Sequence, residues 1–158
     1  MLKAAIAVAV VLATASTAFG QELRRINTCF EEYLAALQLS QLEQGIAHCD
    51  QIADDMTAPS ERRGQAFAQR GLMHARQWAI LGRTAYASQG IADITEAFRL
   101  HTPSKERKHH LLLIRAQLHV AVGQTRRAAA DYTAILSEDP SNAAARRGQD
   151  RLGPAEGL

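Results

Sequence analysis

Apolar residues recur at helical spacing along this chain, and three copies of one dipeptide interrupt the pattern. Pro59-Ser60, Pro103-Ser104 and Pro140-Ser141 each follow a stretch that ends in an apolar helical pattern. Proline cannot continue a helix, whereas a serine hydroxyl can accept a hydrogen bond from the first turn of the next one. We therefore expect each proline to end a helix, each serine to cap the next, and the chain to be a series of helical units.

Two of these units align with each other. Phe67-x-x-Arg70-Gly71-x-x-His74 matches Leu112-x-x-Arg115-Ala116-x-x-His119, and Asp93-Ile94-Thr95 matches Asp131-Tyr132-Thr133. The alignment places small residues opposite each other, Gly71 with Gly90 and Ala116 with Ala128, so that two antiparallel helices can approach closely. Each unit is therefore predicted to be a pair of packed helices.

The last unit resembles the tetratricopeptide repeat (TPR) family, in its variant with Arg-Gly in the first helix and Asp-Tyr in the second. Its residues at the family's signature positions are Leu112, Ala116, Gly123, Ala128, Tyr132, Ile135 and Pro140. The resemblance implies an all-α fold, a short right-handed solenoid of about three TPR-like antiparallel helix hairpins plus a C-terminal capping helix. The units cover about 26–59, 64–103 and 109–140, and the cap covers 142–152. His74 and His119 replace the family's usual aromatic residue.

The composition after residue 20 favours helix throughout, because Ala, Leu, Gln and Arg are frequent while Val, Thr and aromatic residues are scarce. No sheet is expected. Charge is unevenly placed: residues 21–61 carry eight acidic and two basic side chains, and residues 62–158 carry eight acidic and fifteen basic ones. A solvated helical surface explains this asymmetry, and an electrostatic docking surface is the alternative.

The first twenty residues have the pattern of a signal peptide. Lys3 precedes an apolar stretch over 4–12, and Ala18-Phe19-Gly20 is a typical cleavage site. The stretch is shorter than the roughly 20 residues that span a bilayer, so an uncleaved anchor is the lesser alternative. We expect an exported protein, periplasmic or secreted, with no integral membrane segment after cleavage. Its mature chain would contain a helical domain over 21–152 and a flexible tail over 153–158.

The TPR register also pairs the cysteines. In the last unit Leu112 and Tyr132 lie opposite each other across the hairpin, and the same places in the first unit are Cys29 and Cys49. In an exported protein this pairing indicates a disulfide between two helices. Two buried free thiols are the alternative.

The same register places charged residues across each hairpin. The expected pairs are Arg115 with Asp131, Arg70 with Asp93 and, with the signs reversed, Glu32 with His48. Helices packed this closely would partly desolvate these groups, so each charge needs its partner. We expect structural ion pairs here rather than catalytic residues.

The middle hairpin is predicted to be longer than its neighbours. Gly71 and Gly90 are nineteen residues apart, whereas Ala116 and Ala128 are twelve apart. Seven extra residues make about two helical turns. Either the tip, which contains Trp78, protrudes as a contact site, or Trp78 folds back over a neighbouring unit.

Signatures of enzymes are missing from the sequence. It has no Gly-rich phosphate loop, no Gly-x-Ser-x-Gly elbow and no His-Glu-x-x-His metal helix. His109-His110 with His101 is the best metal candidate, but adjacent histidines on a helix point to different faces. We expect no metal and no cofactor, and both export and the weak net charge disfavour nucleic acid.

The favoured function is that of a scaffold module that binds a peptide or a partner protein in the cell envelope. The resemblance implies a concave surface lined by the first helix of each unit. With Trp78 added from the tip, the expected partner-binding residues are Phe30, Leu34, Gln65, Gln69, Leu72, Arg76, Trp78, His110, Leu113 and Gln117. The alternative is an accessory or catalytic protein that acts on an envelope polymer through the Arg-His pairs.

Overall fold

In the computed structural model, which describes residue 29 and residues 39–153, every regular element is an α-helix. The helices are α2 (Leu39–Ala53), α3 (Ser60–Leu81), α4 (Thr84–Leu100), α5 (Lys105–Ala121), α6 (Thr125–Glu138) and α7 (Ala143–Leu152). The prediction of an all-α fold is confirmed for this part of the chain. None of these helices has both the length and the apolar character needed to cross a membrane.

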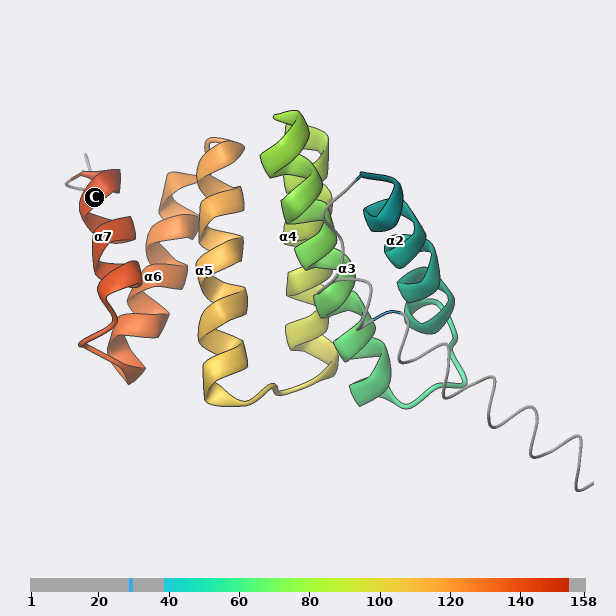
Figure 1. The fold of residues 1–158 in the computed structure, drawn as a ribbon. Helices are drawn as coiled ribbons and strands as arrows, with labels where there is room; N and C mark the ends of the chain where they lie inside the picture. Colours follow the sequence, from blue (N-terminus) through green and yellow to red (C-terminus); the bar gives the residue numbers. More distant parts are fainter. Residues whose placement is uncertain (1–28, 30–38, 154–158) are drawn as a thin grey trace, which may run out of the picture.

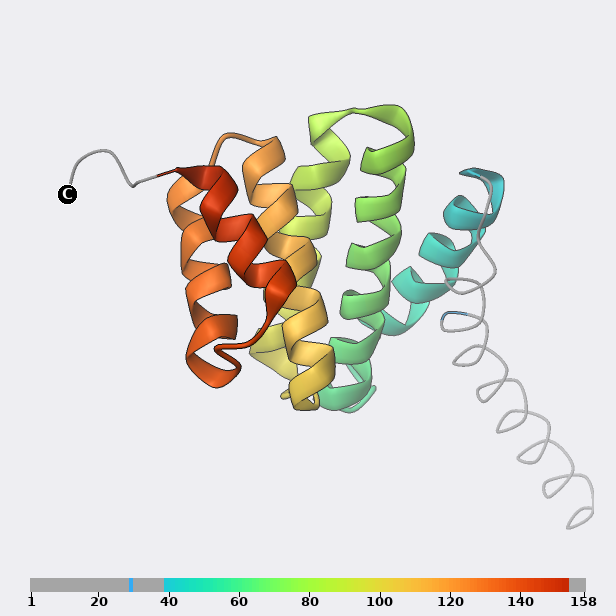
Figure 2. The same ribbon diagram turned by 60° about the vertical axis from the view of Figure 1, so that its left-hand side comes forward.

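The helices stand side by side in chain order, in a row that runs from α2 to α7 (Figure 1). Each helix packs against the next one along the chain, and α5 also contacts α3 and α7. Short connections join them, so that successive helices run in opposite directions (Figure 2). The core divides into three apolar clusters along the row, which contain the fully buried side chains of Met73, Ile94 and Ile135.

Small residues bring the helices of each hairpin together. A Cβ atom on Gly71 would lie 2.8 Å from Cγ1 of Ile94 and 3.2 Å from the carbonyl oxygen of Gly90. The close approach expected at this pair of glycines is therefore confirmed. In the next hairpin, Ala116 and Ala128 are both fully buried. Larger side chains at these positions would push the helices apart.

Only one of the three serines caps a helix. Ser104 Oγ accepts a hydrogen bond from the backbone in the first turn of α5. Ser60 is already the first residue of α3, because Pro59 with its fixed φ occupies the N-cap position. The N-cap of α7 is Asn142, whose Oδ1 accepts a hydrogen bond from the backbone N–H of Ala145. Asparagine is as effective as serine at this position. The predicted caps at Ser60 and Ser141 are wrong.

The α3–α4 hairpin is the longest of the row, and its turn projects beyond the others (Figure 2). The extra length lies mainly in α3, which has 22 residues where α5 has 17. Gly82 ends α3 with φ 68°, and its N–H donates to the carbonyl oxygen of Trp78. Trp78 is half-buried and packs against the second core cluster. Trp78 therefore folds back onto the neighbouring hairpin, and the large apolar side chains exposed at the tip are Ile80 and Leu81.

The last helix covers the end of the row through a close contact with α6. A Cβ atom on Gly148 would lie 2.4 Å from Cζ of the buried Tyr132 ring. Arg146, Arg147 and Arg151 of α7 are exposed. The helix predicted over 142–152 is thus present, with one face against Tyr132 and its arginines exposed.

The substitution Gly148→Ala tests this contact. Alanine favours a helix by up to about 1 kcal/mol over glycine, but its methyl group overlaps the Tyr132 ring and costs more. We expect a net loss of about 1 to 2 kcal/mol in the free energy of unfolding, measured by urea denaturation. Gln149→Ala, at the exposed neighbouring position, should change it by less than about 0.5 kcal/mol. Equal midpoints for the two variants would contradict the contact.

Candidate functional site

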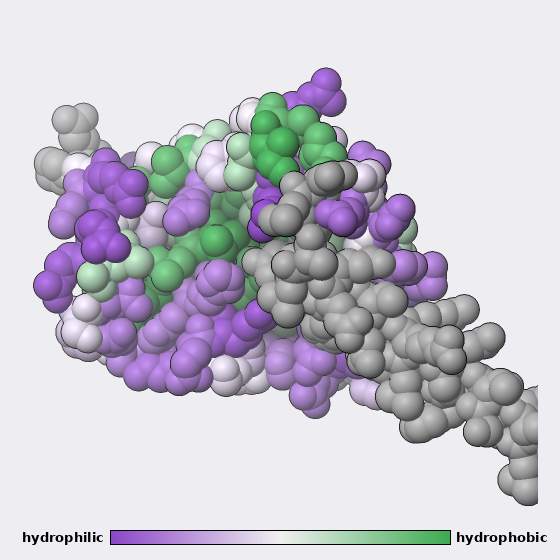
Figure 3. All heavy atoms as spheres, in the orientation of Figure 1, coloured by the Kyte–Doolittle hydropathy of each residue, from purple (hydrophilic) through white to green (hydrophobic). Residues whose placement is uncertain are grey.

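Two hollows lie along the seam between α3 and α5, and we call them together the groove. On α3, the residues that line them recur at helical spacing from Gly64 to Ala79, and on α5 they extend from Arg107 to Leu118. The two hollows therefore lie on one face of the row. The lower hollow is near the starts of both helices, and the upper hollow is near their ends. Figure 3 looks onto this face and shows apolar surface between polar rims.

The lower hollow has a volume of about 280 Å³. Ala68, Phe98 and Leu111 contribute apolar surface to it, and Gln65 and Gln69 contribute amide groups. Pockets for small-molecule ligands usually have volumes of roughly 300 to 1,000 Å³. A space of this size therefore suits one or two amino-acid side chains better than a whole cofactor.

Gln69 is the most informative residue of the lower hollow. Only 6 % of it is exposed, and its Oε1 atom has no hydrogen-bond donor among the described residues. Buried polar groups in folded proteins nearly always have such partners, because an unsatisfied one costs about 1 to 3 kcal/mol. Because Gln69 lines the hollow, rotation of its amide would bring the oxygen within reach of a ligand N–H or O–H donor, which would supply the missing bond.

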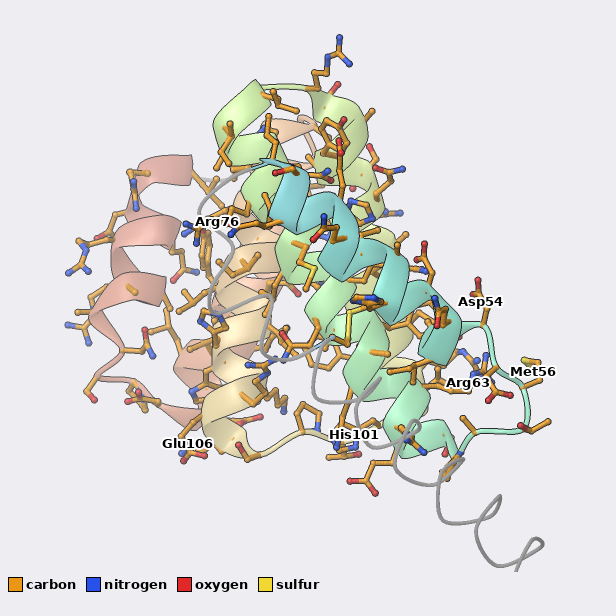
Figure 4. The ribbon with its side chains drawn as sticks, turned by 45° about the vertical axis from the view of Figure 1, so that its right-hand side comes forward. Asp54, Met56, Arg63, Arg76, His101 and Glu106 are labelled. Atoms are coloured by element: carbon orange, nitrogen blue, oxygen red, sulfur yellow. A yellow bond between two sulfur atoms is a disulfide. The ribbon has the colours of Figure 1, made fainter. Side chains whose placement is uncertain are left out.

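The upper hollow has a volume of about 190 Å³ and is more apolar. Leu72 and Trp78 of α3 face Ile114 of α5 across it. Its polar groups come from Arg76 and Gln117. Figure 4 shows Arg76 extending outward from α3. Trp78 thus lines the groove, a position that the sequence left open.

The structure brings most of the described partner-binding candidates into this groove. Gln65 and Gln69 line the lower hollow, and Leu72, Arg76, Trp78 and Gln117 line the upper one. Leu72 is buried, so it forms the floor rather than an open surface. His110 and Leu113 lie outside both hollows, and Phe30 and Leu34 lie outside the described residues.

The α4–α5 connection contributes a part of the lower hollow that the sequence pattern did not predict. His101 and Pro103 line the hollow, together with Phe98 near the end of α4. A Cβ atom on Gly64 would lie 2.6 Å from Cβ of His101, so this connection packs directly on α3. Gly64 and the Pro103 break are the sequence features that mark this contact, although the proline by itself predicts only the end of a helix.

Both predicted Arg-Asp ion pairs of the described hairpins are confirmed. Nη2 and Nε of Arg70 lie 2.6 and 2.9 Å from the two carboxylate oxygens of Asp93, and Arg115 makes the same two contacts with Asp131. The arginine side chains are each 17 % exposed, and the aspartates are nearly buried. Such paired hydrogen bonds fix the two helices of each hairpin relative to each other. Glu32, the expected partner of His48, lies outside the described residues.

A third hollow, of about 320 Å³, contains the Arg70 pair. Arg70 also donates to Asp50 of α2 at 2.7 Å, so its guanidinium joins three helices. Burial by itself would lower the pKa of Arg70, but the hydrogen bonds and charges of Asp93 and Asp50 raise it above its ordinary value. His74 lines the same hollow, with Nδ1 2.9 Å from Oε1 of Gln77. These charged and polar groups therefore have partners within the protein.

His119 has a similar environment in the next hairpin. It is buried, and its Nδ1 lies 2.8 Å from Oε1 of Gln124. Burial lowers the pKa of His119, which favours the neutral imidazole. Nε2 of His109 lies 3.2 Å from Oε2 of Glu138. Among residue 29 and residues 39–153, no three His, Cys, Asp or Glu side chains are grouped so that they could hold a metal ion.

Cys29 and Cys49 form the predicted disulfide, so the alternative of two free thiols is wrong. Both residues are fully buried, in a cluster with Leu42 of α2 and Met73 of α3. The bridge thus joins residue 29 to α2 inside the first core cluster. Its role is to hold this end of the row together.

Comparison of the chain with protein-family models finds no match, and comparisons with curated proteins and with solved structures find no significant one. The distinguishing features of the groove are its two apolar hollows, the unsatisfied oxygen of Gln69 and the polar groups of Arg76 and Gln117.

Proposed function

We propose that this chain is an exported repeat protein of the TPR class, a short right-handed solenoid that binds a peptide segment of a partner protein in the α3–α5 groove. The row of antiparallel helices and the small residues between α3 and α4 support the repeat interpretation. The disulfide supports export, because disulfides persist in oxidising compartments such as the periplasm.

The observation that carries the binding proposal is the buried, unsatisfied oxygen of Gln69. A peptide offers a backbone N–H at nearly every residue, and one of these would complete the hydrogen bonding of Gln69. The neighbouring apolar wall, with Phe98 and Leu111, would receive the side chain of the same ligand residue. The ligand expected here is therefore a peptide with an apolar residue at the contact point.

The upper hollow provides a second contact along the same groove. Gln69 and Arg76 are seven residues apart on α3, which corresponds to about 10 Å along the helix axis. A peptide in the polyproline II conformation covers this distance in about three residues and presents every third side chain on the same face. We expect two apolar ligand side chains at that spacing, one in each hollow, with Arg76 and Gln117 available to backbone carbonyls.

A function on an envelope polymer through the Arg-His pairs is the alternative, and the contacts of these residues give it less support. Arg70 and Arg115 are each engaged by an aspartate through two hydrogen bonds. His74 and His119 are buried, and each contacts a glutamine. Packing and orientation of the hairpins account for all four residues.

The substitution Gln69→Met tests the proposed function, because it keeps the side-chain length and removes both polar atoms. We expect the free energy of unfolding to rise by about 1 kcal/mol, since an unsatisfied buried oxygen is lost. Binding should weaken by at least about tenfold for peptides selected by the wild-type protein from an array of ten-residue sequences. A gain in stability with a loss of binding is the pattern of a residue retained for its ligand.

The matched control is Gln44→Met, at an exposed position of α2 away from the groove. It should change neither peptide binding nor stability measurably. The proposal fails if Gln69→Met binds the selected peptides as the wild type does, or if the wild type selects no peptide above the background of the array.

A further inference from the structure

The two turns at one end of the helical row carry no acidic residues, whereas the outer helices have Glu43 near the start of α2 and Asp150 near the end of α7. The α3–α4 turn and the α5–α6 turn both lie at this end (Figures 1 and 2). The segments around them, 71–92 and 110–130, contain no Asp or Glu. Arg83, Arg126 and Arg127 lie in or directly after these turns, and all three are exposed. We call this surface the turn end.

The same end exposes two adjacent aliphatic side chains. Ile80 and Leu81, at the end of α3, are 49 % and 41 % exposed. Figure 3 shows apolar surface at the tip of the hairpin that projects furthest. The turn is well ordered by backbone hydrogen bonds, from Gly82 to Trp78 and from Tyr86 to Arg83. The tip therefore presents these side chains outward on a fixed support.

The opposite end of the row has a different character. Its connections and the first helical turns after them contain acidic and basic residues together, as in 54–63 and 105–108. Its most exposed apolar residue is Met56, at 76 %, which lies next to Asp54 and Asp55 in the α2–α3 connection (Figure 4). Apolar exposure and uniform positive charge coincide only at the turn end of the described row.

We propose that the turn end binds an anionic lipid surface. Ile80 and Leu81 insert among the lipid headgroups, and Arg83, Arg126 and Arg127 bind lipid phosphates through their paired N–H donors. The arginines are spread over two turns instead of lining a pocket, and the apolar tip is convex. This arrangement suits a flat, negatively charged surface.

Binding at this end leaves the groove between α3 and α5 accessible. The groove follows the length of both helices on a side face of the row, whereas the turn end lies at their tips. The lipid contact does not depend on any residue of the lower hollow. Failure of the peptide proposal would therefore leave this one intact, and the reverse also holds.

The test uses the full chain with vesicles of phosphatidylcholine, with and without phosphatidylglycerol. We expect cosedimentation with the anionic vesicles and a large loss of it in high salt. Trp78 is the only tryptophan of the chain and lies directly below the tip. Its fluorescence should be quenched by lipids brominated in their acyl chains, which reports insertion at the tip and not at the apolar segment over 4–12.

The double variant Ile80→Ser, Leu81→Ser should weaken vesicle binding by about tenfold or more, because it removes the inserted apolar surface. Arg83→Glu should weaken it by at least about fivefold. All of these positions are exposed, so the helical content measured by circular dichroism should not change. Met56→Ser, at the opposite end, is the matched control and should bind as the wild type does.

Several results would overturn the proposal. These are equal binding to neutral and anionic vesicles, cosedimentation without quenching of Trp78, or the same loss of binding in Met56→Ser as in the tip variant. The proposal is also wrong if the protein binds no vesicle at all. In that case, loss of an acidic protein partner in the tip variant would show that the turn end binds a protein instead of a lipid surface.

Discussion

Asp131→Ala is expected to lower the free energy of unfolding by about 3 kcal/mol. The change leaves the guanidinium of Arg115 without its carboxylate between α5 and α6, where only 17 % of that side chain is exposed. Arg115 keeps a hydrogen bond to Thr95 and a position over the Phe98 ring, which compensate only partly. Urea denaturation followed by circular dichroism measures the loss.

The other hairpin provides a matched comparison. Asp93→Ala should cost about 1 kcal/mol less than Asp131→Ala, because Arg70 retains its hydrogen bond to Asp50. Replacing Arg115 and Asp131 together, by Met and Leu, should be much milder than Asp131→Ala alone. A loss below about 0.5 kcal/mol for Asp131→Ala would show that the pair behaves like an ordinary exposed one.

Reduction of the Cys29–Cys49 disulfide is the second change with a large expected effect. The bridge joins residues twenty positions apart, and opening a loop of that length lowers the free energy of unfolding by about 3 kcal/mol in the chain-entropy model. The measurement compares urea denaturation of the wild type with and without dithiothreitol. A downward shift of the midpoint on reduction is the expected outcome.

A variant without the bridge separates the disulfide from other effects of the reductant. Cys29→Ala, Cys49→Ala should have the midpoint of the reduced wild type, or a slightly lower one because two buried sulfur atoms are lost. Its own midpoint should not respond to dithiothreitol. If the oxidised and reduced wild type unfold at the same urea concentration, the bridge contributes nothing to stability.

The contacts that sequence alone predicted correctly are those that a repeated register determines. Once 67–74 was aligned with 112–119 and 93–95 with 131–133, the partners of Arg70 and Arg115 followed, although they are 23 residues apart in one hairpin and 16 in the other. The separation of Leu112 and Tyr132 in the last unit, applied to the first unit, gave Cys29 and Cys49. A spacing that recurs from unit to unit thus carries tertiary information that a single unit does not.

The features that the sequence did not predict depend on the packing and capping contacts of individual residues. The length of the α3–α4 hairpin was predictable, but the packing of Trp78 toward α5 depends on the shape of its neighbours. The lower hollow depends on the packing of His101 against Gly64, between positions 37 residues apart in the chain. Two of the predicted serine caps are wrong for a local reason, because Pro59 occupies the N-cap position of α3 and Asn142 that of α7.

Every contact between helices in the described part of the chain joins elements one or two places apart in the sequence. Such a molecule does not need its last helix in order to assemble its first ones. A chain that emerges N-terminus first, from a ribosome or through a membrane pore, can complete each hairpin and the disulfide while the rest is still being delivered. The order of the helices along the row is then also the order in which the protein can be built.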